Sequence, residues 1–538
     1  MSRWMRFVMT AALMAVLVPS LAMVAPTAGA APPRQSETGE FRMIVGEPSS
    51  LDPNIATDYS IYVTSQLFDT LYRVQDDGSL KMLGAESYEV SEDGLVWTFA
   101  LNPNAKWSDG QPVTADDWVY SWLRALAPET ASGVGTFLTA VRGAAGYTAG
   151  TITDAAEVGL KAVDPLTFEI TMAQPSPQFL AVAGLPYLTP APRHVIEELG
   201  DQWTEAPNLV SNGPYKLEAW DHDQQIVLAR NEHYGGEAPA IERAVLTIAT
   251  GDPCVAQVQA YEADEVDFAT CIPSQDIARM REQYPDEFSL QPLSATIFPV
   301  FDNRQEPWSD VRVRQAFSLA IDRQAIVDVL TDGTSEPAPV LVPEGIIGRD
   351  LSHALTGTVE DAKQLLADAG YPNGEGFPEF TITTSSARGR KELAELIQQM
   401  WKDNLGVTST VEVLEENAYR AWVTARADEP YDIGINGWFT DYVDPNNWYK
   451  EVFVDDYRNM HFTNEEFVAL VEQAAYELDE EKRAELFTQA DAILEREVPA
   501  IPAYYLTDIQ LRKPWLQGLG HTDVLGLFFI AEASIAAP

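Results

Sequence analysis

Cysteine is scarce in this sequence, because its 538 residues include only Cys254 and Cys271. Two cysteines with no histidine beside them do not supply the four ligands of a structural zinc site, so no metal is expected there. In an oxidising compartment the two thiols are expected to form one disulfide that closes a helix-sized loop. A chain of this length also exceeds what one hydrophobic core supports, so two or three domains are expected.

Basic residues are far fewer than acidic ones. The sequence has 35 Lys and Arg against 81 Asp and Glu, which gives a formal net charge of −46 at pH 7. A surface of this sign repels nucleic acid and anionic lipid, so no nucleic-acid partner is expected. The composition predicts a solvated acidic surface, and a polycationic substrate is the weaker interpretation.

Long hydrophobic runs are absent after the N-terminus, where no stretch approaches the roughly 18–20 apolar residues of a membrane span. The first 30 residues differ: Arg3 and Arg6 precede an apolar run that ends in the small residues 28–30. This pattern predicts a secretory signal peptide cleaved near Ala30, and Pro19 and Pro26 make a membrane anchor the weaker alternative. No Cys offers a lipid attachment point, so the mature chain is expected to be exported, and periplasmic in a cell with two membranes.

Sequence motifs of catalysis are also missing. None of the six His lies in an H-x-x-x-H or H-E-x-x-H pattern, and no nucleophile elbow, phosphate loop, dinucleotide fingerprint or EF-hand is present. Acidic pairs such as Asp455 and Asp456 are expected by chance among so many carboxylates. The sequence therefore favours a binding protein without cofactor over an enzyme, and an exported hydrolase stays as the alternative.

Short strand patterns alternate with amphipathic helices along the whole chain, which predicts an α/β fold. Period-two alternation predicts strands at 96–101 and 166–172. Thr114 and Asp117 form a capping-box signature for a helix at 115–126. Further helices are expected at 310–330 with a new cap at Asp322, at 359–370 ending at Gly370, at 390–407 and at 464–497.

Eight segments, in this order, resemble the periplasmic solute-binding proteins of peptide transporters, solute-binding protein family 5. The segments are "SSLDPN", "AKWSDGQPVTADDWVYSW", "APETAS", "PNLVSNGPYKLEAW", "DVRVRQAFSLAIDRQAIV", "AKQLLADAGY", "WFTDYVDPNNW" and "IPAYYLTDIQLRKPW". They span nearly the whole mature chain, and "YSWLRAL" with "APETAS" is most similar to the oligopeptide-binding branch.

The resemblance implies a two-lobed α/β periplasmic-binding-protein fold (type II, cluster C) with an extra inserted domain. The first lobe would comprise 31–68, 193–294 and 506–538, the extra domain 69–192, and the second lobe 295–505. The lobes are expected to close over a ligand by a hinge motion.

Residues 434–449, "GINGWFTDYVDPNNWY", place carboxylates among aromatic rings. In the family an Asp in this motif holds the α-ammonium of a bound peptide, and the matching residue here is Asp441. A buried ammonium needs such a partner, although a turn or helix-cap role is the alternative for this Asp. Asp444 is the better turn residue, because it precedes a proline.

The resemblance also implies the surroundings of the peptide. The backbone of Asn436, Gly437 and Trp438 would pair with the peptide main chain. Trp438 and Tyr419 would line side-chain pockets, with core packing as the alternative role. Tyr442 is expected to belong to the same ligand-binding site, and Asp58 with Tyr59 to a strand that also pairs with the peptide.

The anchor for the C-terminal carboxylate of the peptide is expected at Arg390, with Arg388 one alignment step away and an exposed helix Arg as the alternative interpretation. The sequence departs from the family at two places. Residues 133–134 are Gly and Val where the oligopeptide branch has a pocket Tyr, and Ile435 stands where a basic residue is expected. The length and side-chain preference of the ligand are therefore not carried over.

The sequence thus predicts a monomeric periplasmic receptor that delivers peptides to an inner-membrane ABC permease. A relative of the same fold that binds an oligosaccharide, an opine or a nickel chelate is the first alternative. A peptide receptor for signalling is another.

Overall fold

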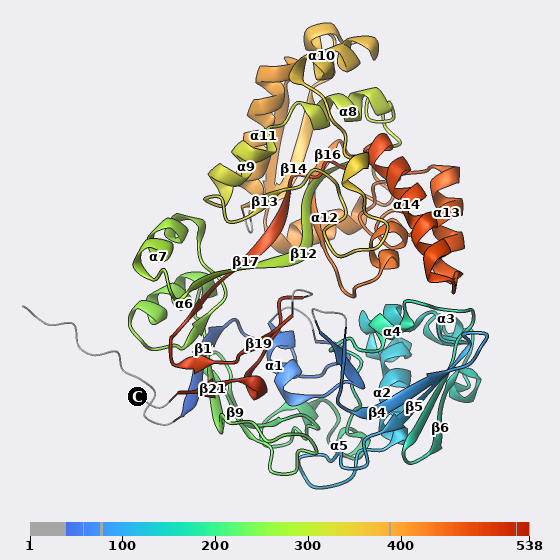
Figure 1. The fold of residues 1–538 in the computed structure, drawn as a ribbon, viewed down its shortest axis with the longest axis vertical. Coiled ribbons are helices and arrows are strands. Elements are labelled where there is room, and N and C mark those ends of the chain that lie inside the picture. The colour runs from blue at the N-terminus through green and yellow to red at the C-terminus, as the bar shows by residue number, and fades with distance from the viewer. Residues whose placement is uncertain (1–38, 57–58, 76–78, 387–388, 523–524, 537–538) are drawn as a thin grey trace, which may run out of the picture. The chain divides into compact units, whose positions relative to one another are not determined.

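The computed structural model describes residues 39–56, 59–75, 79–386, 389–522 and 525–536. Residues 35–538 form one compact unit, which is an α/β structure with three main sheets among the described residues (Figure 1). Among those residues no helix is long and apolar enough to cross a membrane.

The largest sheet has seven strands from distant parts of the chain. At its centre the long strand β12 (Phe288–Phe301) pairs antiparallel with β17 (Tyr504–Arg512), and the two run side by side through the middle of Figure 1. Strand β14 is parallel to both of its neighbours, so the sheet is mixed. The order is β11 (Phe268–Ala269), β17, β12, β16 (Ile433–Phe439), β14 (Phe380–Ser385) and β15 (Ser409–Leu414), with β13 (Glu336–Pro337) added on β17.

Helices cover both faces of this sheet, because alternate side chains of a strand point to opposite faces. Ile433 and Ile435 of β16 pack in a core with α8 (Val311–Leu319), α9 (Arg323–Leu330), α10 (Val359–Asp368) and α11 (Arg390–Leu405). Trp438 packs in a second core with the π-helical turn η8 (Asn446–Lys450), α13 (Glu465–Tyr476) and α14 (Glu480–Glu497). The strand that carries part of the candidate site is therefore held from both sides.

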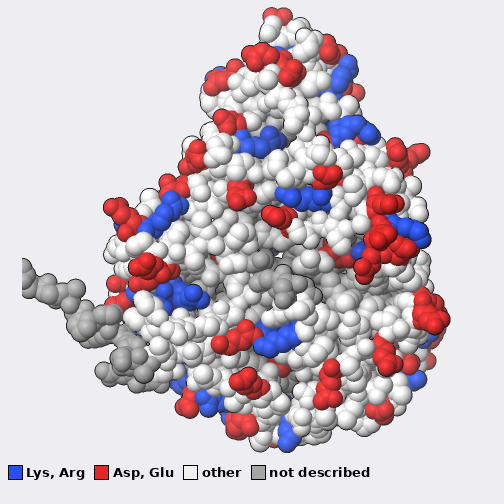
Figure 2. Space-filling model, in the orientation of Figure 1, with Lys and Arg blue, Asp and Glu red and all other residues white. Residues whose placement is uncertain are grey.

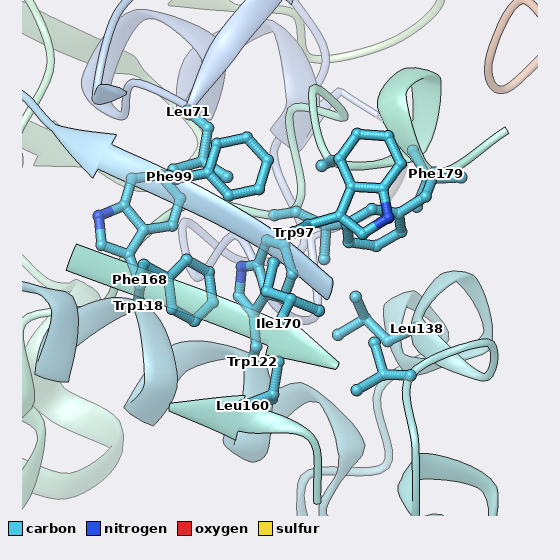
Figure 3. Packing of buried hydrophobic residues seen from close by; sticks show 14 of the residues in the cluster. Leu71, Trp97, Phe99, Trp118, Trp122, Leu138, Leu160, Phe168, Ile170 and Phe179 are labelled. Carbon is cyan, nitrogen blue, oxygen red and sulfur yellow. The ribbon is translucent and has the colours of Figure 1, made fainter. Parts of the chain in front are cut away.

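Two four-stranded sheets lie outside this layer. The first has the order β1 (Glu40–Val45), β10 (Arg243–Ile248), β9 (Gln225–Arg230), β8 (Tyr215–Asp221), and α1 (Ser60–Leu67) shares its core. The second is antiparallel, with the order β4 (Ala85–Val90), β5 (Val96–Leu101), β7 (Thr167–Thr171), β6 (Leu160–Asp164). Trp118 and Trp122 of α2 (Ala115–Leu126) pack against Phe168 of β7, with ring centroids 6.3 and 5.1 Å apart (Figure 3).

Shorter elements complete the described structure. Small strand pairs are β2 (Tyr72–Val74) with β3 (Leu80–Met82), β18 (Leu516–Gln517) with β21 (Ser534–Ile535), and β19 (Gly520–His521) with β20 (Phe528–Phe529). The remaining α-helices are α3 (Ala144–Thr148), α4 (Phe179–Val182), α5 (Arg193–Leu199), α6 (Pro253–Glu262), α7 (Ile277–Gln283) and α12 (Glu416–Ala425).

Most of the sequence-based element predictions are confirmed. The backbone N–H of Thr114 donates to Asp117 at 2.8 Å in the predicted capping box of α2. The 310–330 helix restarts at Asp322, whose side chain accepts the Ala325 N–H at 3.0 Å. The prediction of one helix at 464–497 is wrong: α13 and α14 are separate, because Asp479 caps a new helix by accepting the Lys482 N–H at 3.1 Å.

The structure contains the predicted disulfide between Cys254 in α6 and Cys271, with Cα atoms 4.7 Å apart. The antiparallel four-stranded sheet lies within the predicted inserted segment 69–192, although the domain boundaries themselves stay predictions. Figure 2 shows carboxylates spread over this face of the molecule with basic groups among them, rather than one continuous acidic patch.

Candidate ligand-binding site

Strand β16 has one partly open edge. It pairs antiparallel with β12 along its whole length, whereas β14 pairs only with Ile433 and Gly434 on the other side. Within the described residues, positions 436–438 therefore have a neighbouring strand on one side only. An extended ligand can add to such an edge through backbone hydrogen bonds.

Two side chains reach the backbone carbonyls of this strand. Nε of Arg458 donates to the Gly437 carbonyl at 3.1 Å, and the Tyr419 hydroxyl donates to the Ile435 carbonyl. Gly437 also tolerates no larger residue without movement, because an added Cβ would lie 2.6 Å from Cδ1 of Ile297.

The loop after β16 is organised by the fully buried side chain of Asn447. Its Oδ1 accepts the Asp441 backbone N–H and the Trp438 indole N–H, both at 3.0 Å. Its Nδ2 donates to Oδ2 of Asp441 at 3.2 Å and to Oε2 of Glu451 at 2.9 Å. An Asn amide has two donors and two acceptor positions, so its hydrogen bonding is complete. Asn447 therefore fixes the Asp441 carboxylate relative to the Trp438 ring and the Glu451 carboxylate.

The Asp-Pro turn in the same loop is tied to helix α14. Oδ1 of Asp444 accepts the Asn446 N–H at 2.9 Å and Nη2 of Arg483 at 2.7 Å, and both charged side chains are buried. The prediction that Asp444 is the turn residue of this stretch is confirmed. Asp441, in contrast, lines both cavities described below.

Asp441 and Glu451 are two partly buried carboxylates bridged by one amide. Burial raises the pKa of Asp441 above its ordinary value, while Asn447 and Arg458 oppose the rise. Burial, together with the charge of Asp441, raises the pKa of Glu451 to about 7, although the Tyr442 hydroxyl donates to it. In the described part of the chain neither carboxylate forms an ion pair, and Arg458 is the cation that lowers the pKa of Asp441.

Asp441 lines two cavities, of about 740 Å³ and 520 Å³. The larger is also lined by Tyr442 and by residues of β2, β3 and the C-terminal segment, including Arg73, Lys81 and Phe529. Both volumes fall in the range of about 300–1,000 Å³ typical of ligand sites. No group of three or more His, Cys, Asp or Glu in the described residues is arranged to hold a metal ion.

The smaller cavity is lined by a basic residue, Arg458, that was not predicted from the sequence. Arg458 lies with its guanidinium 4.5 Å from the centroid of the Trp438 ring, and both line this cavity with Tyr457. Burial and the neighbouring Arg426 lower the pKa of Arg458 to about 10. Arg458 lies in an irregular segment that carries no motif. The only sequence feature that could have indicated it is an isolated Arg shortly after Asp455 and Asp456.

Three further predicted residues lie in β16 or beside it. Tyr419 of α12 is 2% exposed and lines neither cavity, so these cavities do not support its predicted pocket role. Asn436 is buried, accepts the Tyr419 hydroxyl at 3.3 Å, and leaves its Nδ2 without a partner in the described structure. Arg390 begins α11, lies 3.7 Å from Glu416 and 5.9 Å from the Tyr419 ring centroid.

The other predicted positions do not contribute to the two cavities within the described residues. Asp58 and Arg388 fall outside the described residues. Tyr59 precedes α1 with its ring 6.5 Å from that of Tyr62, and it lines neither cavity. Val134 and Ile435, at the two departures from the family pattern, are buried core residues.

Comparisons with known proteins agree with this architecture. The model of the bacterial extracellular solute-binding proteins, family 5 Middle, matches residues 80–459. The periplasmic oligopeptide-binding protein OppA of Salmonella typhimurium is 32% identical over 505 residues, which are 91% of each chain. The probable deoxycholate-binding periplasmic protein YgiS of Escherichia coli is 31% identical, covering 88% of this chain and 89% of its own.

A solved structure, the periplasmic oligopeptide-binding protein OppAIV from Borrelia burgdorferi, is also similar. It has a TM-score of 0.77 and 29% sequence identity, and the match covers 92% of this chain and 99% of that one. The predicted two-lobed α/β fold of this family is therefore confirmed. Together with the family match, which covers more than half of the sequence, these likenesses show that the chain belongs to family 5 of the bacterial extracellular solute-binding proteins.

Proposed function

We propose that this protein is a periplasmic receptor that captures short peptides and delivers them to an ABC importer. The observation that carries the proposal is Asp441, a partly buried carboxylate that lines both cavities and has no ion pair among the described residues. A carboxylate kept in such a place is costly unless a cation joins it, and the α-ammonium of a peptide is such a cation.

The edge of β16 supports a peptide rather than a simple amine. Residues 436–438 stand directly before the Asp441 loop and have a strand neighbour on one side only within the described structure. Backbone pairing there would give affinity that does not depend on the peptide sequence. Trp438 and Tyr442, which line the smaller and the larger cavity respectively, would contact side chains of the ligand.

The carboxylate end of the peptide has two candidate partners. Arg390 was predicted from the sequence, but it already lies 3.7 Å from Glu416. Arg458 lines a cavity with Asp441 and forms no ion pair among the described residues. Arginine suits either role, because its planar fork matches a carboxylate. Arg390 and Arg458 are therefore alternative partners for the C-terminal carboxylate of the peptide.

A non-peptide ligand is the second candidate function. It is supported by one relative, the probable deoxycholate-binding periplasmic protein YgiS. The negative charge at Asp441, which has no ion pair among the described residues, opposes an anionic ligand of that kind and favours an amine. The remaining parts of the proposal are export with cleavage near Ala30, action as a monomer, binding without catalysis, and the domain boundaries given above.

Mass spectrometry of the ligand released by denaturing the natively exported protein tests this function. A set of short peptides with free N-termini supports it, and their lengths report the size of the closed site. A single mass that is not a peptide would leave the family membership intact but overturn the peptide assignment.

A further inference from the structure

Glu451 lies behind Asp441, and no motif of the sequence pointed to it. The Nδ2 of Asn447 lies 2.9 Å from Oε2 of Glu451 and 3.2 Å from Oδ2 of Asp441, so a single amide group holds both carboxylates. Tyr442 donates its hydroxyl to Oε1 of Glu451. The arrangement is rigid, since Asn447 is fully buried and Tyr442 is 5% exposed.

The surroundings supply little positive charge to this pair. Lys450 is occupied by Asp455 at 2.8 Å and Glu472 at 3.4 Å, and Arg483 is occupied by Asp444. The titratable and charged neighbours of the two carboxylates are Tyr442, Asp444, Lys450, Asp455, Tyr457 and Arg458 from the same part of the chain, and Tyr187 from the segment after α4. Of these described neighbours, Arg458 is the basic residue that forms no ion pair, and its Nε donates to the Gly437 carbonyl.

We propose that Glu451 is a positioning residue of the amine site, and that an ammonium group bound at Asp441 expels a proton from Glu451. The inference rests on the proposed function, because it needs a ligand that carries an amine. Because the two carboxylates lie so close together, they cannot both ionise easily while the site is empty. One proton therefore stays bound to the pair. A cation at Asp441 favours the ionised form of Glu451, and the proton leaves to solvent. The total charge of the Asp441 and Glu451 carboxylates then changes from −1 to −2 when an amine binds.

The direction of the pH dependence follows from linkage. Burial holds the pKa of Glu451 at about 7 in the ligand-free protein, and the bound ammonium lowers it. Affinity for an amine is therefore greatest between about pH 7 and 8, where Glu451 is largely ionised and the α-amine is still charged, and falls as the pH falls through 7. If the ammonium lowers the pKa by about one unit, the change in affinity is about tenfold.

Isothermal calorimetry with trialanine at pH 6.5 tests the proposal on the wild-type protein. Two buffers with different ionisation enthalpies report the number of protons released. The α-amine of the peptide stays charged at this pH, since its pKa is about 7.7–8.0. We expect a fraction of a proton to be released with trialanine. Equal apparent enthalpies in the two buffers would overturn the proposal.

Glu451→Gln provides the variant test, because its amide oxygen can accept from Asn447 and its NH2 group can donate to the Tyr442 hydroxyl oxygen, but it cannot lose a proton. Dissociation constants are measured between pH 5.5 and 7.5. We expect E451Q to match the wild type at pH 5.5, to bind about tenfold more weakly at pH 7.5, and to release no proton. The matched control Glu472→Gln removes a nearby carboxylate that touches neither Asp441 nor Asn447, and should retain the wild-type profile.

The outcomes separate the two proposals. Binding of trialanine with identical pH profiles for wild type and E451Q rejects the role of Glu451 and leaves the proposed function standing. Failure of the wild type to bind trialanine or a tryptic mixture of short peptides at every pH rejects the proposed function, and with it the ligand-linked role of Glu451.

Discussion

Nδ2 of Asn447 lies 3.2 Å from Oδ2 of Asp441, although the two residues are six positions apart in a loop that has turned back on itself. The same amide accepts the Asp441 backbone N–H at 3.0 Å. A carboxylate on a loop would ordinarily sample several rotamers, and ordering it on binding would cost free energy. Asn447 already holds the Asp441 side chain in the ligand-free protein, so this cost does not arise on binding. The binding site for the ammonium group is therefore preorganised.

Arg390 and Arg458 differ in whether a protein carboxylate already lies beside them, and therefore in how readily they can bind a ligand carboxylate. We expect Arg458→Gln to weaken binding of a peptide acid by about 1.5–3 kcal/mol more than binding of the same peptide with a C-terminal amide, because a charged hydrogen bond is lost only with the acid. We expect a smaller effect from Arg390→Gln, because Arg390 already lies 3.7 Å from Glu416. Affinity measurements on the matched peptide pair decide the order, and a larger effect at Arg390 would restore it as the anchor.

Stability should depend on Glu495, a buried carboxyl of α14 that is 4% exposed and accepts the Leu341 N–H at 2.9 Å. Burial raises its pKa to about 8. An unfolded Glu has a pKa of about 4.3, so above that value the unfolded chain loses a proton that the folded protein keeps. The free energy of unfolding therefore falls as the pH rises from about 4.3 to 8, by at most about 1.4 kcal/mol per pH unit.

Glu495→Gln keeps the acceptor for Leu341 and removes the proton. We expect its thermal midpoint to exceed that of the wild type at pH 8 and the advantage to shrink toward pH 5. Glu485→Gln, an exposed position on the same helix, is the control and should follow the wild type at both pH values. An E495Q variant with no pH-dependent difference would contradict the account.

The disulfide should contribute to stability through the loop that it closes. Cys254 and Cys271 are 17 positions apart, and a loop of this length is worth about 3 kcal/mol in the chain-entropy model. We expect a reductant to lower the thermal midpoint of the wild type and to leave a Cys254→Ser, Cys271→Ser double variant unchanged. A wild type that is insensitive to a reductant known to have cleaved the bond would show that the bond is not stabilising.

The resemblance to the solute-binding family predicted the fold, and local sequence patterns predicted most of the helices and strands. Strand β5 and helix α2 follow from alternation and a capping box at Thr114 and Asp117. The break between α13 and α14 was missed, since Asp479 reads as one more acid in an acidic helix.

The roles of Asn447, Glu451 and Arg458 were not predictable. Each depends on how the chain folds back after the turn at Asp444, through a π-helical segment that has no simple sequence signature. Tyr419, predicted to line a side-chain pocket, is buried beside β16, where its hydroxyl donates to the Ile435 carbonyl, and its pocket role stays a prediction.

The most direct test of the central claim is the affinity of wild type and Asp441→Asn for trialanine and for N-acetyl-trialanine. Removing one partner of a buried charge pair costs about 3–5 kcal/mol, so D441N should bind the free-amine peptide at least a hundredfold more weakly. The substitution should change binding of the acetylated peptide little. Equal losses for the two peptides would contradict the assignment of Asp441 as the amine anchor.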